Sequence, residues 1–216
     1  MRLSHRIPRV PWRASTPWAL RPRMVAPLIV GLVLFGFGEG LLVVSRWGAT
    51  PWTVFAQGVA RQLHLPLGWA TLAVSACVLV AWWPLHERPG FGTLANVVVI
   101  ALVLDLTATS ITSPLAPFVR AVFVIGAIAS IGVGSALYLT TGLGPGPRDG
   151  LMTSLHRRLG VSVVYVRAVL ELTILTVGWL LGGTVGVGTA VFASTIGFSI
   201  GASLRALEWL VARVSR

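Results

Sequence analysis

The residues best placed to do chemistry are ionisable side chains inside long apolar stretches. Arg167 and Glu171 stand four positions apart within residues 163–182, which puts them on one face of the helix that this stretch predicts. A charge is costly in hydrocarbon, so such a pair needs a reason. It either locks two helices together or lines a route for a substrate or protons, and the sequence leaves both interpretations open.

Glu39 is the second such residue, in the run Gly36-Phe37-Gly38-Glu39-Gly40. The glycines weaken the helix and let another backbone or a ligand approach closely. Glu39 therefore either marks a kink near the outer interface or belongs to a site. Asp105, towards the outer end of its apolar stretch, favours a snorkelling or capping role. We expect the substrate pathway to be lined by Glu39, Asn96, Arg167 and Glu171.

Residue patterns typical of hydrolysis or of metal binding do not occur. The four histidines are scattered over the tail and loops, and none has a partner at metal-ligand spacing. No serine stands in a nucleophile elbow. The glycine-rich turns 88–93 and 142–150 lack the Gly-Lys-Ser/Thr of a nucleotide loop. We expect a protein that is not an enzyme and has no cofactor or metal; an intramembrane enzyme acting on lipid is a third hypothesis.

Membrane-spanning helices must position these side chains. The 216 residues are 55% hydrophobic and only 11% charged, too little charge for a soluble surface. About 20 residues cross ~30 Å of hydrocarbon at ~1.5 Å per residue. The sequence thus predicts an all-α polytopic bundle, a single transmembrane domain over residues 24–216. Its about six spans are 24–45, 67–85, 91–110, 117–141, 163–182 and 187–211.

The chain contains an internal duplication. An ungapped shift of 96 positions superposes Gly48 on Gly144 and Pro51 on Pro147, which indicates two copies, roughly residues 25–110 and 121–206. Three spans per copy is an odd number, so the copies would form inverted repeats that insert in opposite senses. The turn residues that we single out as structural are Gly48, Pro51, Trp52, Gly90, Gly92, Thr93, Gly144, Pro147, Asp149, Gly186, Gly188 and Thr189.

Each copy also has a short amphipathic segment after its first span. Thr50-Pro51 predicts a helix N-cap followed by proline at the first helical position, and Pro147 opens the equivalent helix. About 14 residues reach only ~21 Å, short of a crossing. Residues 51–64 and 147–160 are therefore either interfacial or re-entrant helices. Asp149 would complement the dipole of its helix.

Small residues recur every four positions on the last two apolar stretches. They are Ala193, Gly197 and Gly201 on one stretch, and Gly178 and Gly182 on the other. Such faces allow close helix packing, within the chain or between copies in a homo-oligomer.

Charge predicts the orientation in the membrane. The net charge of +11 comes from 17 basic residues, all Arg, which cluster between apolar stretches and favour anionic lipid headgroups over nucleic acid as partner. Residues 1–23 carry six Arg and no acid. They would form a basic cytoplasmic tail, either disordered or a lipid-surface anchor through Trp12 and Trp18. Most loop arginines place both termini in the cytoplasm of a bacterial inner-membrane protein; Arg46, Arg61 and Arg120 do not fit.

Several turn motifs are similar to those of a known family. They are Gly-x-x-Pro-Trp at 48–52, GxGT at 90–93 and 186–189, and GLGPGPRDGLM at 142–152. Over about residues 25–210 the chain resembles the bacterial YczE-like integral membrane proteins, grouped with YitT and YyaS proteins. Members often have Asp after Pro-Trp, where this chain has Thr53. The resemblance implies an inner-membrane protein without an established activity and supplies no catalytic residues.

Two functions fit these features. The inverted duplication and the charges within spans predict a small-solute or ion transporter, or a channel-like protein, with a site between the repeats. The basic tail and the arginine-rich segment 147–158 predict instead a non-catalytic membrane scaffold or accessory subunit that recruits a partner.

Overall fold

The fold is known from a computed structural model that describes residues 8, 10–113 and 116–214. The described residues form helices and turns without strands. The helices are α1 (Pro22–Ser45), α2 (Pro51–Leu63), α3 (Leu67–Val80), α4 (Phe91–Ser110), α5 (Pro117–Thr140), α6 (Pro147–Leu159), α7 (Val163–Leu180) and α8 (Val187–Val214). In these described ranges α1, α4, α5, α7 and α8 are long and apolar enough to cross a membrane. The predicted all-α polytopic bundle is confirmed.

The second apolar stretch, 67–85, forms a shorter helix than we expected. Helix α3 has 14 residues and ends at Val80, about 21 Å of rise, so it is too short to cross alone. Pro84 explains the early end, because proline lacks an N–H and disfavours helix in the residue before it. A sixth span exists only if α2 and α3, bent by 112° at their junction, are taken as one broken span.

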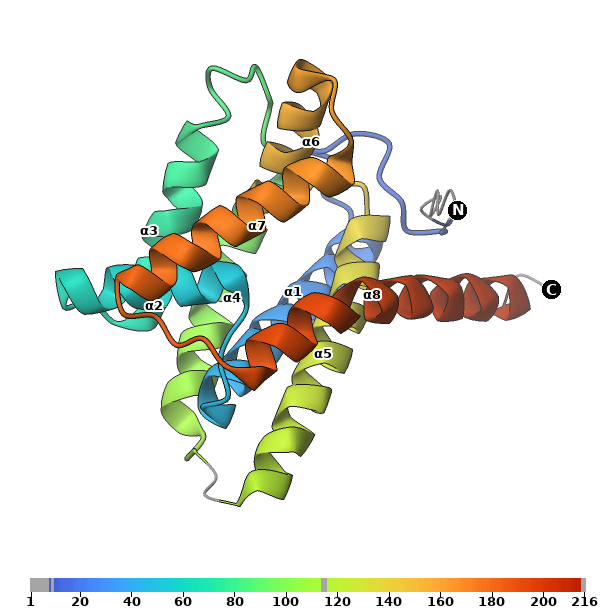
Figure 1. Ribbon diagram of the computed structural model, residues 1–216. Helices are drawn as coiled ribbons and strands as arrows, with labels where there is room; N and C mark the ends of the chain where they lie inside the picture. Colours follow the sequence, from blue (N-terminus) through green and yellow to red (C-terminus); the bar gives the residue numbers. More distant parts are fainter. Residues whose placement is uncertain (1–7, 9, 114–115, 215–216) are drawn as a thin grey trace.

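The two halves repeat the same order of helices. Equivalent helices begin 96 residues apart, as in α2 and α6, α3 and α7, and α4 and α8. Helices α1 and α5 lie side by side and antiparallel (Figure 1): Gly31 meets Gly134, whereas Gly38, further along α1, meets Ala127, earlier in α5. Insertion of the halves in opposite senses would place α1 and α5 in this way, and the insertion itself stays a prediction.

Each half docks its first turn onto the other half. The turn after α1 meets the start of α8, where Gly188 N donates to Trp47 O at 2.6 Å; the turn after α5 meets the start of α4, where Gly92 N donates to Leu143 O at 2.8 Å. The predicted turn motifs are thus two equivalent joints between the halves.

Glycine is required at the centre of both joints. Gly48 and Gly144 have φ of +113° and +120°, which L side chains rarely adopt. A Cβ at Gly48 would lie 2.3 Å from Thr189 Oγ1, and one at Gly144 would lie 2.7 Å from Thr93 Oγ1.

The short helices also contact the other half: α2 packs mainly against α7, and α6 packs against α3 as well as α7. A Cβ at Gly178 would lie 2.5 Å from the backbone of Phe55, so the helices approach closely there. Trp82 Nε1, just after α3, donates to Pro147 O at 3.0 Å. Pro51 and Pro147 are buried, and whether the two helices are interfacial or re-entrant stays a prediction.

The small-residue stripe on α8 is used only in part. Gly197 has no atom within 4 Å of a Cβ built on it, although Gly201 is buried. Among the described residues, close packing within the chain is therefore absent at Gly197, and packing between copies stays a prediction.

The basic N-terminal segment is tied to one end of the bundle. Ala14 N donates to Thr141 O at 2.7 Å, and Phe91 N donates to Pro17 O at 3.1 Å. Trp12 Nε1 donates to Thr140 Oγ1. Disorder was therefore the wrong expectation for residues 10–21. Residues 1–7 and 9 lie outside the described residues, as does Arg216, which we expect in the cytoplasm.

Candidate functional site

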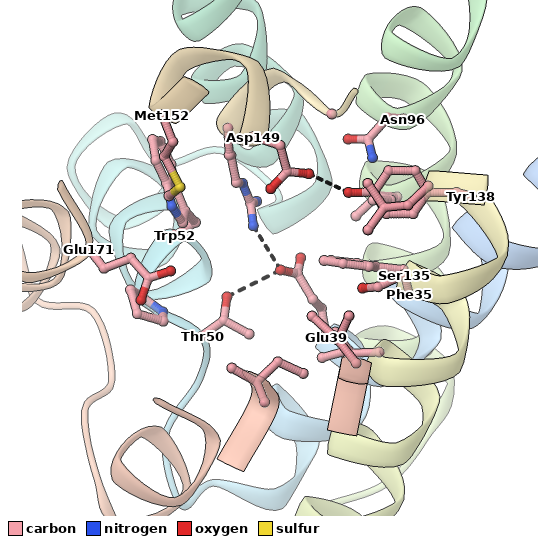
Figure 2. A pocket seen from close by; sticks show the side chains of 18 of the residues that line it. Phe35, Glu39, Thr50, Trp52, Asn96, Ser135, Tyr138, Asp149, Met152 and Glu171 are labelled. Atoms are coloured by element: carbon pink, nitrogen blue, oxygen red, sulfur yellow. Dashed lines mark hydrogen bonds and ion pairs between the residues drawn. The ribbon is translucent and has the colours of Figure 1, made fainter. Parts of the chain in front are cut away.

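A cavity of about 220 Å³ lies between the two halves (Figure 2). Its walls come from α1, α2, α4, α5, α6, α7 and α8, and many of its residues occupy equivalent positions in the two copies. The pairs separated by 96 positions are Phe35 and Ile131, Glu39 and Ser135, Thr50 and Gly146, Trp52 and Arg148, Asn96 and Phe192, and Ile100 and Ile196. The cavity therefore lies where the two copies meet.

Glu39 forms the deep end of this cavity and is fully buried. Its Oε1 accepts hydrogen bonds from Arg148 Nη1 at 3.0 Å and from Thr50 Oγ1 at 3.2 Å. The neighbouring Gly38 and Gly40 press against α5 and α4, so α1 is held closely on both sides of the carboxylate. The depth of Glu39 in the membrane, and with it a place near the outer interface, stays a prediction.

The other two polar groups at this end come from the short helices. Thr50 caps α2 by accepting from Thr53 N, and this fixes its hydroxyl beside Glu39. Arg148 is in the first turn of α6, and its guanidinium lies 5.3 Å from the centroid of the Trp52 ring, within cation–π range. Two helix starts, one from each copy, thus deliver these groups to a carboxylate on α1.

Asp149 has a neutral partner. Tyr138 on α5 donates its hydroxyl hydrogen to Asp149 Oδ2, and Figure 2 shows the two side chains pointing towards one another. Asp149 is the acid of the first turn of α6, where it also complements the helix dipole, as we predicted.

Arg167 and Glu171 lie at a more open edge of the same cavity. Arg167 Nε donates to Glu171 Oε1 at 2.8 Å, and their side chains are 43% and 25% exposed. The pair therefore exists and also lines the cavity, so the two interpretations of it are compatible. Asn96 lines the cavity from α4, next to Gly146.

Two buried polar atoms of the wall have no hydrogen-bond partner: Glu39 Oε2 and Trp52 Nε1. Buried polar atoms in native proteins are nearly always paired, by protein or by bound molecules. Among the described residues, an acceptor and a donor on two side chains that line the cavity are thus without a partner.

All four residues predicted for the pathway, Glu39, Asn96, Arg167 and Glu171, line this one cavity. Asp105 does not; its Oδ1 accepts from Gly68 N at 2.7 Å and caps the start of α3, the capping role expected for it. Sequence reasoning missed Arg148 and Tyr138 as site residues. A signal for Arg148 existed, because it is a charged residue where the first copy has Trp52. Among the described residues no three His, Cys, Asp or Glu are grouped as a metal would require.

Comparison with known proteins gives one family and two relatives. Residues 22–205 match the family described as "Family of unknown function (DUF6198)". An uncharacterized protein of Haemophilus influenzae is 44% identical over 191 residues, 88% of each chain. The uncharacterized membrane protein YczE of Bacillus subtilis is 32% identical over 191 residues, 85% of this chain and 88% of that protein. No solved structure matches.

Proposed function

The chain belongs to the DUF6198 family of YczE-like membrane proteins, whose function is unknown, and from this premise we propose that it transports a small solute through the cavity between its halves. The observation that carries the proposal is the ion pair between the fully buried Glu39 and the mostly buried Arg148, one from each copy, both of which line that cavity. In transporters built from inverted repeats, broken or short helices deliver polar groups to a site at the repeat interface. Helices α2 and α6 do so here.

A purely structural role explains the charges less well. Two desolvated charges rarely add net stability relative to apolar residues of similar size, and charges within membrane spans usually mark a pathway. The wall of this cavity holds five charged side chains, and the remaining acidic residues outside it are Asp105, which caps α3, Glu87 and Glu208.

We propose that solute enters the cavity between α7 and α8. Helix α3 packs along α4, but the equivalent α7 and α8 are not a closely packed pair and diverge in Figure 1. Arg167 and Glu171 on α7 and Phe192 on α8 line the cavity from the two sides of this gap. Solute would enter beside the partly exposed pair.

Transport is tested by reconstituting the full chain in liposomes and measuring uptake of a panel of labelled small solutes and ions. We expect Glu171→Gln to lower the uptake rate about tenfold or more, through lost stabilisation of the bound solute. The matched control is Glu87→Gln, which removes a carboxylate paired with Arg157 outside the cavity and should leave uptake unchanged. Folded protein that moves no member of the panel contradicts the proposal, and wild-type uptake by Glu171→Gln removes Glu171 from the pathway.

The scaffold alternative draws less support from the described residues. Arg157 pairs with Glu87, and Arg158 donates to Pro84 O, so both arginines already have partners within the chain. Co-purification of a stoichiometric partner, lost on removal of residues 1–20, would favour the scaffold instead.

A further inference from the structure

We propose, building on the transport function proposed above, that the ligand of this cavity is a small organic cation with N–H donors, such as a protonated primary amine. The inference names the class of solute from the charges, the free polar atoms and the aromatic rings of the wall.

The first argument is charge. The wall contains three carboxylates, Glu39, Asp149 and Glu171, and two guanidiniums, Arg148 and Arg167, which leaves an excess of one negative charge (3 − 2 = 1). Glu39 and Glu171 are paired with the two arginines, whereas the Asp149 carboxylate has, among the described residues, the neutral Tyr138 hydroxyl as its hydrogen-bond partner. A ligand with one positive charge would neutralise a cavity that is otherwise costly to bury.

The second argument is the free oxygen of Glu39. Oε2 is buried and accepts no hydrogen bond, and an unsatisfied buried group costs about 1–3 kcal/mol, more when charged. A primary ammonium has three N–H donors and forms strong charge-assisted bonds to a carboxylate. A quaternary ammonium carries the same charge but offers no N–H, so it cannot satisfy this oxygen.

The third argument is the aromatic part of the wall. The rings of Phe35 and Tyr138 are 6.3 Å apart in an edge-to-face arrangement, beside the charged end of the cavity, and organic cations are attracted to such rings. Trp52 Nε1 is buried without an acceptor, so an amine with a hydroxyl group would satisfy this donor too. A volume of about 220 Å³ equals that of roughly seven liquid waters at ~30 Å³ each, enough for a small amine.

An anion fits this cavity poorly. Both arginines of the wall are engaged by carboxylates at 3.0 and 2.8 Å. A bound carboxylate or phosphate would have to displace Glu39 or Glu171 and leave that side chain unpaired in the same space.

Binding can be measured without transport. The full chain is placed in nanodiscs of phosphatidylcholine, and its thermal unfolding midpoint is followed with 2-aminoethanol, ethane-1,2-diol, glycolate or choline. These four probes share a two-carbon frame and differ in charge and in N–H donors. We expect only 2-aminoethanol to raise the midpoint saturably, because a ligand of the folded state stabilises it by mass action.

Variants connect this binding to the cavity. Asp149→Asn and Glu39→Gln should weaken the apparent affinity about tenfold or more, whereas Glu87→Gln outside the cavity should leave it unchanged. If Glu39→Gln does not fold, the apparent affinity of Asp149→Asn alone tests the inference. Equal stabilisation by the diol or glycolate, tighter binding of choline, wild-type affinity in Asp149→Asn, or no shift with any amine overturns the inference.

A lipid with a primary amine in its headgroup offers the same chemistry through the gap between α7 and α8. Nanodiscs that contain phosphatidylethanolamine separate the two sources: a rise of the midpoint with this lipid but not with free amine, abolished in Asp149→Asn, identifies the lipid. Amine binding without any flux would contradict the transport function and keep this inference. Saturable flux of an anion would support the transport function and contradict this inference.

Discussion

The charged residues of the cavity stand at positions where the two copies differ. Glu39 stands where the second copy has Ser135, and Arg148 stands where the first copy has Trp52. Each charged residue has an uncharged equivalent, so the ion pair joins a group found only in the first copy to one found only in the second. The duplication therefore explains the arrangement of the helices around the site, and the differences between the two copies explain its charges.

The Glu39–Arg148 pair predicts a specific pattern of stability. Glu39→Gln leaves the Arg148 guanidinium, which is 20% exposed, without its carboxylate, and we expect a loss of about 3–5 kcal/mol of unfolding free energy. Glu39→Leu combined with Arg148→Met removes both charges. The double variant should lose less unfolding free energy than the sum of the losses in Glu39→Leu and Arg148→Met alone. Unfolding in mixed detergent micelles measures this cycle.

The exposed pair of Arg157 and Glu87 is the control for that cycle. Its side chains are 58% and 26% exposed, and an exposed pair contributes at most about 1 kcal/mol. Additive losses at Glu39 and Arg148 would show that the two side chains do not interact.

Helices and turns are joined across the copies by two equivalent joints, and this equivalence predicts equivalent mutants. Gly48→Ala and Gly144→Ala both place a Cβ within 2.7 Å of a threonine Oγ1 at a strongly positive φ. We expect each to destabilise the protein by more than the ~1–3 kcal/mol of a strained backbone alone. The measurement is again the unfolding free energy in mixed micelles.

Gly160 separates the two causes of this loss. It has φ +68° at the end of α6, and a Cβ there would meet nothing within 4 Å. Gly160→Ala should therefore cost only the left-handed conformation, about 1–2 kcal/mol. If Gly48→Ala loses no more unfolding free energy than Gly160→Ala does, the joint at Gly48 accommodates the added Cβ by moving apart.

Much of this arrangement of helices follows from the sequence. Thr50-Pro51 and Pro147 predicted the starts of α2 and α6, because a cap and a proline are local signals. The shift of 96 positions made the second copy a check on the first. Hydrophobic patterns also placed Glu39 and Glu171 within helices, which is why both belong to the predicted pathway.

Other features could not be predicted, because they depend on which helices meet. A pattern of apolar residues shows which face of α2 is buried but not that α7 covers it. The same holds for Tyr138, whose partner Asp149 belongs to another helix. Residues 10–21 have the composition of a disordered tail, but hydrogen bonds to the backbone of Thr141 and Phe91 and to the Thr140 hydroxyl hold them against the bundle.

At the scale of the whole molecule, we expect the loop that contains His86 and the loop that contains Ser113 to lie on opposite sides of the membrane. In a Cys77→Ser background, His86→Cys should react with a membrane-impermeant thiol reagent from the cytoplasmic side, and Ser113→Cys from the other. Helix α4 separates these positions and is long enough to cross. Labelling of both from one side would contradict the predicted insertion.

Removal of residues 1–20 tests the whole molecule in a second way. The two backbone hydrogen bonds of Ala14 and Pro17 to the bundle would be lost, so the thermal unfolding midpoint should fall. These contacts lie away from the cavity wall, and uptake per folded protein should persist. Loss of uptake in protein that is still folded would show that the segment takes part in transport.

The packing of α2 against α7 has a consequence for biosynthesis. Helix α2 ends at Leu63, and its partner α7 begins only at Val163, about 100 residues later, or roughly 5–20 s of translation. During that interval the newly made α2 lacks the helix that will pack against it. Helix α6, by contrast, finds α3 already made. The first half therefore stays incompletely packed until α7 is made. We expect a pause or truncation before α7 to leave an incompletely folded protein that the cell's quality control degrades.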